Sequence, residues 1–319
     1  MKITWFSSFF YFLLTTITGC ASETGNHNAA VNNGNNPIPA KVEVVKLSND
    51  EYEFLEGPAW DGKNSVYFTD IPQNSIYKYN LNTKKFDLVT SALHEPNGLM
   101  FSNKNTLYTC EHKTGSLIEL DKNGTKLSVL AGSYNGAPFN QPNDLVIDKQ
   151  GGVYFTDPSW NEDRPQVTKG VYYRNSNGKT KLLVKDMDKP NGIILSTDES
   201  TLYINDSDSF EVRAYGIAAP GQLGAKQTFA FLHRPEGYQG NNTAADGMAI
   251  DIHGNLYITT KFGIQVFDKN GKKLGIIDMP EPPSNCAFAG KNLDTLFVTA
   301  RKNTYMIKLN TTGLRFPQS

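Results

Sequence analysis

Polar and apolar positions follow one pattern six times along this chain. Each copy begins with a residue that carries a side-chain oxygen, usually followed by glycine. A short apolar strand, a turn and a second strand with an aromatic residue come next. The second-strand aromatics recur every 40 to 54 residues and are Tyr67, Tyr108, Tyr154, Tyr203, Tyr257 and Phe297. Because strand-rich repeats of about 40–50 residues are typical of β-propeller blades, the pattern predicts an all-β, six-bladed β-propeller.

Two further strands follow in most copies. After the third copy they are residues 170–175 and 181–185, and Asn-Gly pairs such as Asn123-Gly124 favour tight turns between strands. We therefore expect four antiparallel strands per blade. The sixth copy lacks a fourth strand, whereas residues 42–47 form an extra strand before the first copy. This N-terminal strand is expected to complete the last blade and close the ring, because closure removes an open strand edge.

The N-terminal segment predicts export and lipid attachment. Lys2 precedes a mostly apolar run, residues 3–17, which is shorter than the roughly 20 residues of a membrane-spanning helix. The run ends in Ile17-Thr18-Gly19-Cys20, which resembles the lipobox of bacterial lipoproteins. We expect residues 1–19 to be a lipoprotein signal peptide and Cys20 to carry the lipid. An ordinary cleaved signal and an uncleaved anchor are the alternatives.

Composition bounds the rest of the chain. Residues 20–40 are rich in Asn, Gly and Ala and predict a flexible tether ahead of a propeller that spans residues 41–319. The chain has 31 Lys and Arg against 32 Asp and Glu, with no basic run, which argues against a nucleic acid partner. No obligate protein partner is indicated. The expected location is the bacterial cell envelope, lipid-anchored and either periplasmic or surface-exposed.

Two cysteines lie within the repeats. Cys110 and Cys286 fall in the second and sixth copies, which are not neighbours in a six-bladed ring. A disulfide needs Cα atoms within about 7 Å, so both are expected to be buried free thiols.

The residues that begin the six copies are the main candidates for chemistry. In a propeller the first strand of each blade lies nearest the axis, so these side chains should converge at one end of the central channel. All six carry a side-chain oxygen and none is positive: Glu56, Asn97, Asn143, Asn191, Asp246 and Asn285. Carboxylate and amide oxygens are the ligands that calcium prefers, whereas zinc favours His and Cys.

Turn chemistry is the competing interpretation of these positions. Asn-Gly and Asp-Gly are common turn pairs, and each alone predicts a turn. Glu56 fits no turn preference, however, and the position stays polar where glycine is replaced, in Asn143-Asp144 and Asn285-Cys286. A metal site is therefore the prediction. The roles of Asn97 and Asn285, as ligands or as substrate-binding residues, stay open; we group them with the latter.

The second strand of each blade returns to the same end of the channel. Its last residues should surround the mouth of the site: Asp70, Glu111, His112, Asp157, Trp160, Ser207, Lys261 and Arg301. His112 and Trp160 are the candidates for substrate contact, while Asp70 and Asp157 suit strand-ending turns equally well. The sequence contains no Gly-x-Ser-x-Gly and no His-Glu-x-x-His motif, which disfavours a serine or zinc-helix hydrolase.

Several of these segments resemble the gluconolactonase family, which includes regucalcin (senescence marker protein) and, more distantly, diisopropyl fluorophosphatase. The most specific are EGPAW, QPNDLVID with YFTDPSW, KPNGI, and ADGMAID with GIQVFD, and the resemblance extends from Leu55 to about Leu309. It implies a six-bladed propeller with one calcium ion in the central channel. The family's metal ligands match Glu56, Asn143, Asn191 and Asp246, and the family's Asp is usually assigned as the general base. Regucalcin-like members have Arg where this chain has Gln141, so their substrate preference is not carried over.

These observations lead to an expected activity. We expect an enzyme, a calcium-dependent hydrolase that opens a sugar lactone to its aldonic acid, with the metal polarising the carbonyl and Asp246 as general base. Zn²⁺, Mn²⁺ and Mg²⁺ stay open as alternative ions. A metal-dependent phosphotriesterase on the same site and a non-enzymatic sugar-binding or scaffold propeller are the alternative functions.

Overall fold

The computed structural model describes residues 36–160, 166 and 168–318. The described chain contains 24 strands and no helix. The first three blades are β2 (Leu55–Trp60), β3 (Ser65–Asp70), β4 (Ser75–Asn80) and β5 (Lys85–Thr90); β6 (Pro96–Phe101), β7 (Leu107–Glu111), β8 (Ser116–Leu120) and β9 (Lys126–Ala131); and β10 (Leu145–Ile147), β11 (Val153–Asp157), β12 (Gly170–Arg174) and β13 (Thr180–Val184). The last three are β14 (Pro190–Leu195), β15 (Thr201–Asp206), β16 (Glu211–Ala219) and β17 (Gln222–Phe231); β18 (Met248–Ile250), β19 (Leu256–Thr260), β20 (Gly263–Phe267) and β21 (Lys273–Ile277); and β22 (Asn285–Ala289), β23 (Thr295–Ala300) and β24 (Asn303–Lys308) with β1 (Val44–Lys46).

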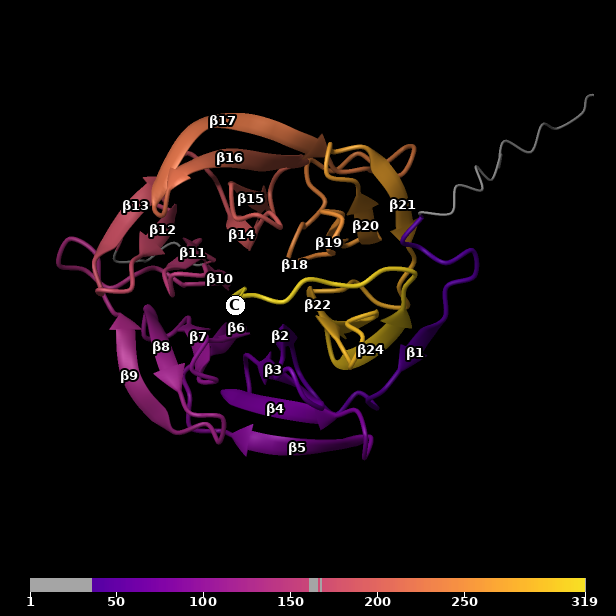
Figure 1. Cartoon of the computed structure of the whole chain (residues 1–319), viewed down its shortest axis with the longest axis horizontal. Coiled ribbons are helices and arrows are strands. Elements are labelled where there is room, and N and C mark those ends of the chain that lie inside the picture. The colour runs from indigo at the N-terminus through magenta and orange to yellow at the C-terminus, as the bar shows by residue number, and fades with distance from the viewer. Residues whose placement is uncertain (1–35, 161–165, 167, 319) are drawn as a thin grey trace, which may run out of the picture. The chain divides into compact units, whose positions relative to one another are not determined.

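These strands form six four-stranded antiparallel sheets arranged as the blades of a propeller, as the sequence predicted. The innermost strand of each sheet lies nearest the central axis, and successive blades follow one another around it (Figure 1). The ring closes through the N-terminal strand: β1 pairs with β24, with Val44 opposite Ile307. The predicted closing strand is therefore confirmed, and it protects an edge that β24 would otherwise leave open.

Burial falls from the inside of each blade to the outside. In the first blade every residue of β2 and β3 is buried, whereas β5 is half-buried or exposed throughout. The inner strands are buried because they face neighbouring blades on both sides, which explains why apolar residues are nearly continuous there.

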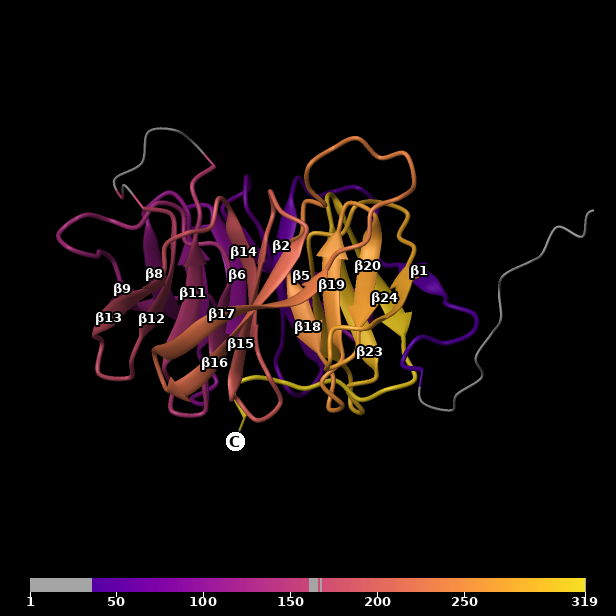
Figure 2. The ribbon, with the colours of Figure 1, turned by 90° about the horizontal axis from the view of Figure 1, so that it is seen from above.

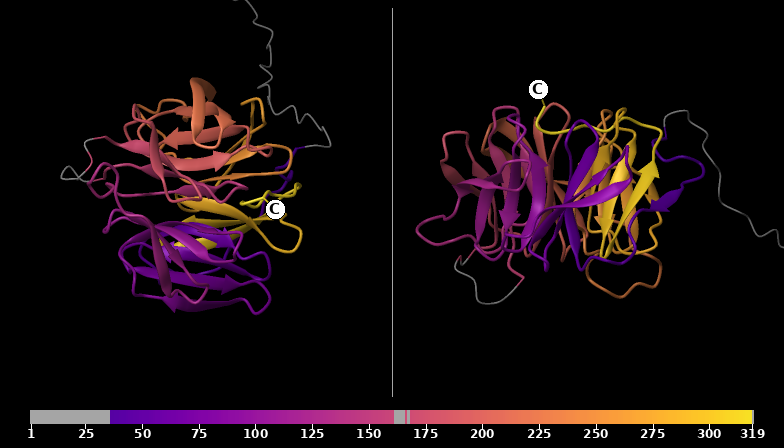
Figure 3. Two further views of the ribbon diagram at one scale, coloured as in Figure 1. Left: turned by 60° about the vertical axis from the view of Figure 1, so that its left-hand side comes forward. Right: turned by 90° about the horizontal axis from the view of Figure 1, so that it is seen from below.

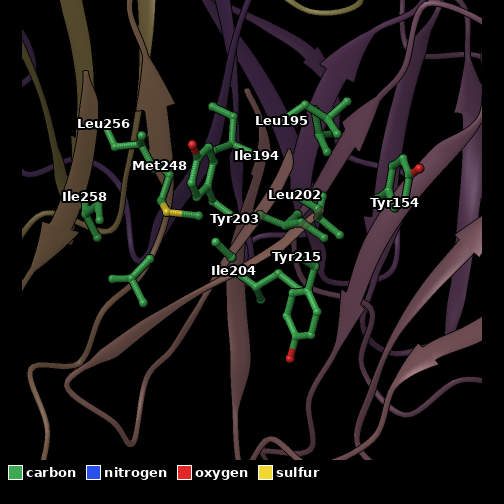
Figure 4. Packing of buried hydrophobic residues seen from close by; sticks show 14 of the residues in the cluster. Tyr154, Ile194, Leu195, Leu202, Tyr203, Ile204, Tyr215, Met248, Leu256 and Ile258 are labelled. Carbon is green, nitrogen blue, oxygen red and sulfur yellow. The ribbon is translucent and has the colours of Figure 1, made fainter. Parts of the chain in front are cut away.

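The core consists of the side chains that fill the spaces between blades. Figure 4 shows one such cluster, to which Tyr203 and Ile204 of β15 and Met248 of the next blade belong. The aromatics that mark the repeat belong to these clusters. Phe297 packs against Phe68 across the closure of the ring, with ring centroids 5.9 Å apart. Burying one such aromatic side chain contributes roughly 1.5–3 kcal/mol, so the repeated aromatic is a main stabilising element of each interface between blades.

The glycine after the first residue of a copy is required by close approach of the next blade. A Cβ atom on Gly98 would lie 2.6 Å from the carbonyl oxygen of Asn143, and one on Gly192 would lie 2.2 Å from that of Asp246. Gly57 also has a positive φ of 46°, which favours glycine. The Asn-Gly and Asp-Gly pairs thus stand at close contacts between neighbouring innermost strands.

The innermost strands are held in position by the second strand of the preceding blade. Thr69 donates a hydrogen bond to the carbonyl oxygen of Asn97 (3.0 Å), and Thr156 donates one to that of Asn191 (2.8 Å). Asn205 bonds the carbonyl of Asp246 in the same way (2.6 Å). Each blade therefore fixes the start of the next innermost strand.

The C-terminal segment, residues 310–318, crosses one face of the propeller. Gly313 donates to the carbonyl of Leu293 in the last blade (2.6 Å), and Leu314 donates to that of Ile250 in the blade before it (2.9 Å). In Figures 2 and 3 this segment lies on the face opposite the long loop between β17 and β18. One end of the channel is thus covered by a segment outside the repeat.

The remaining expectations from the sequence concern the two cysteines of the repeats and the N-terminal segment. Cys110 and Cys286 are buried free thiols, as predicted. The predicted signal peptide and Cys20 lie outside the described residues. No helix within the described ranges is long and apolar enough to cross a membrane.

Candidate active site

The six residues predicted to converge on the axis do stand at or just before the start of the innermost strands. Five of these side chains are at most 6% exposed, and Asp246 is partly buried. They occupy one end of the channel because each holds the same position in its blade.

Three amides form a hydrogen-bonded row across this end. Asn97 Nδ2 donates to Asn143 Oδ1 at 2.8 Å, and Asn143 Nδ2 donates to Asn191 Oδ1 at 2.5 Å. The row continues to Ser207, whose hydroxyl accepts from Asn191 Nδ2 at 2.9 Å and donates to the carbonyl of Ala245 at 2.8 Å. The amides are therefore in contact and share fixed orientations.

Asn285 holds the side chain of Glu56 in position through a hydrogen bond. Asn285 Nδ2 donates to Glu56 Oε2 at 2.9 Å, and the Gly57 amide donates to the same oxygen at 2.8 Å. The Cys286 amide donates to Asn285 Oδ1 at 2.8 Å and so fixes the other end of that side chain. Asn285, grouped with substrate-binding residues from sequence, does not line the pocket described below; it orients Glu56.

The two carboxyl groups at this end strongly influence each other. Burial raises the pKa of Glu56 to about 7, although hydrogen bonds from Gly57 and Asn285 and the charge of Arg301 act in the opposite direction. Burial, followed by the charges of Glu56 and Asp144, raises the pKa of Asp246 well above its ordinary value. Two negative charges in one buried place favour neutralisation by a proton or by a cation.

The chemistry of the donor set fits a hard divalent cation. The side-chain oxygens of Glu56, Asn143, Asn191 and Asp246 could hold calcium, which binds carboxylates and amides. Asn97 Oδ1 is buried and is one of two such polar side-chain atoms without a hydrogen-bond partner in the described chain. No group of three or more His, Cys, Asp and Glu residues suited to a metal occurs in the described ranges, so amide oxygens would have to complete the set of ligands.

A pocket of about 370 Å³ opens above these oxygens. Its lining combines the polar floor with apolar and aromatic walls: Phe54, Glu56, Ile71, Asn97, His112, Gln141, Asn143, Trp160, Asn191, Asp246 and Arg301. His112 Nε2 lies 2.8 Å from Asn97 Nδ2, and Trp160 is 41% exposed at the rim. Both residues chosen for substrate contact therefore line this pocket.

The acids at the ends of the second strands have another role. Asp157 accepts hydrogen bonds from the backbone amides of Asn140 (2.9 Å) and Gln141 (2.8 Å), and Asp70 accepts those of Glu53 (3.0 Å) and Phe54 (3.1 Å). These carboxylates fix the loops that precede the innermost strands. Since Phe54 and Gln141 line the pocket, the acids shape the site without reaching its floor.

Two further mouth residues, Glu111 and Lys261, lie apart from the pocket, whereas Arg301 lines it. Glu111 accepts from the amide of His94 at 3.1 Å and pairs with Lys126 at 3.5 Å. Lys261 bonds Tyr238 and Asn242 in the loop between β17 and β18. Neither Glu111 nor Lys261 lines the pocket.

Asp144 is the charged residue that the sequence reasoning did not select. It occupies the position that glycine has in four other copies, and it lines a cavity of about 80 Å³ deeper in the channel together with Asn285, Cys286, Arg315 and Phe316. Burial and then the charge of Glu56 raise its pKa to about 7. The replacement of glycine by an acid was the signal that could have identified it.

The chain is similar in sequence and fold to known proteins of one family. Residues 54–302 match the family model described as SMP-30/Gluconolactonase/LRE-like region. A gluconolactonase of Zymomonas mobilis is 29% identical, with 94% of this chain and 95% of the relative covered. The solved structure of a gluconolactonase from Xanthomonas campestris is 27% identical with a TM-score of 0.77, covering 86% of this chain and 91% of that one. Regucalcin of Agrobacterium tumefaciens, a calcium-binding protein, has a TM-score of 0.73 at 17% identity, covering 86% and 97%, a likeness that concerns the fold alone.

Proposed function

Because the chain belongs to the SMP-30/gluconolactonase/LRE-like family, we propose that it hydrolyses a sugar lactone to the aldonic acid with the help of a divalent cation, calcium being the ion that its oxygen donors suit best. The family and its lactonase relatives support a lactone-hydrolysing function. The observation that carries the finer proposal is the set of amide and carboxylate oxygens beneath a pocket of about 370 Å³.

Glu56, Asn143, Asn191 and Asp246 would hold the ion. When bound, it supplies Lewis-acid polarisation of the lactone carbonyl. The row of hydrogen-bonded amides holds the donor oxygens in place before substrate arrives, so that little reorganisation is needed during the reaction.

Asp246 is the proposed general base. It removes a proton from the attacking water, the water oxygen bonds to the carbonyl carbon, and the ester C–O bond of the lactone breaks. The proton then moves to the departing oxygen, which becomes a hydroxyl group. The side chain of Asn191 favours the charged form of the Asp246 carboxylate. General-base catalysis of this kind contributes about 10²–10⁴-fold.

The walls of the pocket suit a small polar ring. Trp160 and Phe54 offer flat apolar surfaces for the C–H face of a sugar, while His112 and Asn97 offer polar groups for its hydroxyls. A site built in this way binds one side of a sugar through apolar contact and reads the other through hydrogen bonds.

A substrate panel tests the proposal. Aldono-lactones, aryl esters and phosphotriesters should be offered with calcium and with a chelator. Hydrolysis of aldono-lactones that is lost on chelation and restored by calcium is the expected result. The melting temperature should also fall on chelation, because an ion that binds the folded state alone stabilises it. Lactone hydrolysis that continues in chelator would remove the metal from the proposal, and hydrolysis of phosphotriesters alone would replace the substrate class.

We further propose that Cys20 anchors the enzyme to the membrane of the cell envelope through a lipid. Cys20→Ala should move the protein from the membrane fraction to the soluble fraction, because the thiol that carries the lipid is lost. A variant that stays with the membranes would assign the anchoring to the apolar segment before it.

A further inference from the structure

Arg301 lies at the rim of the pocket, at the junction of the last and first blades. Its carbonyl accepts a hydrogen bond from the amide of Leu55 at 2.8 Å, directly before Glu56. Its guanidinium carbon lies 5.1 Å from the centroid of the Phe54 ring. Phe54 is itself fixed through the bond of its amide to Asp70. The guanidinium is thus held beside the pocket by packing against an aromatic ring.

The charge of this guanidinium acts on Glu56 and Asp246 from a distance, without direct pairing to either carboxylate. Within the described chain Arg301 forms no ion pair and no side-chain hydrogen bond, whereas Arg213 pairs with Asp186 and Glu211. The Arg301 side chain is exposed, and it lines the pocket together with Glu56 and Asp246. Its five N–H donors are therefore available to a molecule in the pocket, in a planar arrangement that matches carboxylate or phosphate.

The charges of the pocket also favour an anion. A divalent cation would offset the charges of Glu56 and Asp246, which leaves the positive charge of Arg301 uncompensated at the rim. Asp144 lies deeper and shares its cavity with Arg315, so it does not provide that compensation. A pocket with one excess positive charge attracts and holds negatively charged substrates.

We propose that Arg301 binds an anionic group of the substrate, so that lactones carrying a carboxylate or a phosphate away from the reacting carbonyl are preferred over neutral lactones. This inference rests on the proposed lactonase function and names its substrate class. Arg301 acts in it as a specificity-determining residue at the rim of the pocket.

The backbone at Arg301 supplies a suitable test variant. Arg301 has a positive φ of 51° in the two-residue turn between β23 and β24, a conformation that favours glycine. Arg301→Gly should therefore fold at least as well as the wild type while removing the guanidinium. Arg234 provides a matched control, because its guanidinium also lies over an aromatic ring, Phe210, at 5.3 Å, but does not line the pocket.

The experiment compares three lactones on calcium-loaded wild type, Arg301→Gly, Arg301→Lys and Arg234→Gly. The probes are glucono-1,5-lactone as the neutral arm, glucaro-1,4-lactone as the carboxylate arm and 6-phosphoglucono-1,5-lactone as the phosphate arm. We expect kcat/KM of wild type to be at least about 10-fold higher for one anionic arm, and the arm that responds identifies the group. In Arg301→Gly this preference should fall to within about 2-fold, mainly through KM, while the neutral lactone changes by less than about 3-fold. Arg301→Lys should retain part of the preference, and Arg234→Gly all of it.

A binding measurement separates the two proposals. Calorimetric titration of glucarate, 6-phosphogluconate and neutral glucitol into the same proteins needs no turnover. If no lactone is hydrolysed but Arg301→Gly weakens binding of one anion about 10-fold without affecting glucitol, the lactonase proposal fails and the anion site stands. If wild type hydrolyses neutral and anionic lactones equally, or Arg301→Gly leaves the preference unchanged, the inference about Arg301 is wrong while the lactonase proposal stands. Absence of both turnover and anion binding overturns both.

Discussion

The two ends of the central channel are built in different ways. At the substrate end, six oxygen-bearing residues come from the same position of six repeated blades, and a pocket of about 370 Å³ opens above them. At the opposite end, Arg315 and Phe316 of the C-terminal segment line the deeper cavity, and this segment has no counterpart among the other described residues (Figure 1).

The difference indicates that the two ends of the channel have different roles. Repetition brings six similar side chains together through local interactions alone. Each blade contributes its own first residue, and hydrogen bonds from the preceding blade hold that residue in position. The unique segment then closes one end, so that substrate approaches the proposed metal ligands from one side. Chemistry should therefore respond to changes at the substrate end, and stability to changes at the covered end.

The largest effect is expected for Asp246→Asn. Both Asp246→Asn and Glu56→Gln keep an oxygen ligand and remove one charge, but only the first removes the proposed base. At saturating calcium, kcat of Asp246→Asn should fall about 10²–10⁴-fold, the usual contribution of a general base. Glu56→Gln should mainly weaken calcium binding, which excess calcium partly restores. Calcium titrations of lactone hydrolysis for both variants measure the contrast, at about 1.4 kcal/mol per tenfold.

Asp144→Asn is the control from deeper in the channel. It removes a partly buried acid that interacts with both carboxyls but lies outside the substrate pocket. Its kcat should stay within about 3-fold of the wild type. Equal and complete rescue of Asp246→Asn and Glu56→Gln by calcium would contradict the role of Asp246 as base and leave it as a ligand.

The sequence predicted the substrate end well for a physical reason. A residue that recurs at one position of every blade must lie at one level of the axis, so the placement of Glu56, Asn97 and Asn143 followed from the fold alone. The closing strand followed from the missing fourth strand of the last blade. Both inferences depend on symmetry and need no knowledge of individual contacts.

Features without a repeat could not be placed in this way. The position of Asp70 in the sequence is compatible with the mouth of the pocket, but its carboxylate bonds the backbone amides of a loop that begins 17 residues earlier. Asn285 follows the repeat, yet its side chain is fixed by Cys286 and Glu56. The path of residues 310–318 across the channel depends on contacts with three different blades, which no local pattern specifies.

The covered end should control stability with little influence on catalysis. Phe316 is 5% exposed and belongs to the core cluster between the third, fourth and fifth blades. Phe316→Ala should lower the free energy of unfolding by about 3 kcal/mol, since removing a buried aromatic typically costs about 3–5 kcal/mol. Phe231→Ala, at a residue that is 69% exposed, should change it by less than about 0.5 kcal/mol.

Urea denaturation and initial rates on the same preparations check this. At a temperature where Phe316→Ala is fully folded, its kcat/KM for the lactone should match that of the wild type. A parallel loss of activity would mean that the covered end supports the floor of the pocket, and a stable variant would mean that the C-terminal segment only rests on the channel.

The smallest expected effect is the dependence of stability on pH in chelator. Burial raises the pKa of Glu56 from 4.5 to about 7 in the folded state. Between these two values the folded protein binds more protons than the unfolded chain, so stability falls as pH rises through this window. The metal-free protein should therefore be more stable at pH 5.5 than at pH 8, on the order of 2 kcal/mol given about 1.4 kcal/mol per pKa unit. Asp198 does not disturb this window, because its pKa is lowered to about 2 and its contribution is lost only in stronger acid.

Calcium should reverse the direction of this pH effect, which distinguishes a metal site from an ordinary pair of buried acids. A bound cation favours the charged carboxylates, so protons then compete with it, and acidification should destabilise the loaded protein. Glu56→Gln supplies the matched control, because it should lose the share of the stabilisation by acid that Glu56 contributes in chelator, while Asp144 and Asp246, whose pKa values burial also raises, keep theirs. The measurement is the melting temperature of both proteins at pH 5.5 and at pH 8, each with calcium and with chelator. If the stability of the wild type depends on pH in the same way with and without calcium, the two carboxyls at the substrate end do not bind a cation together.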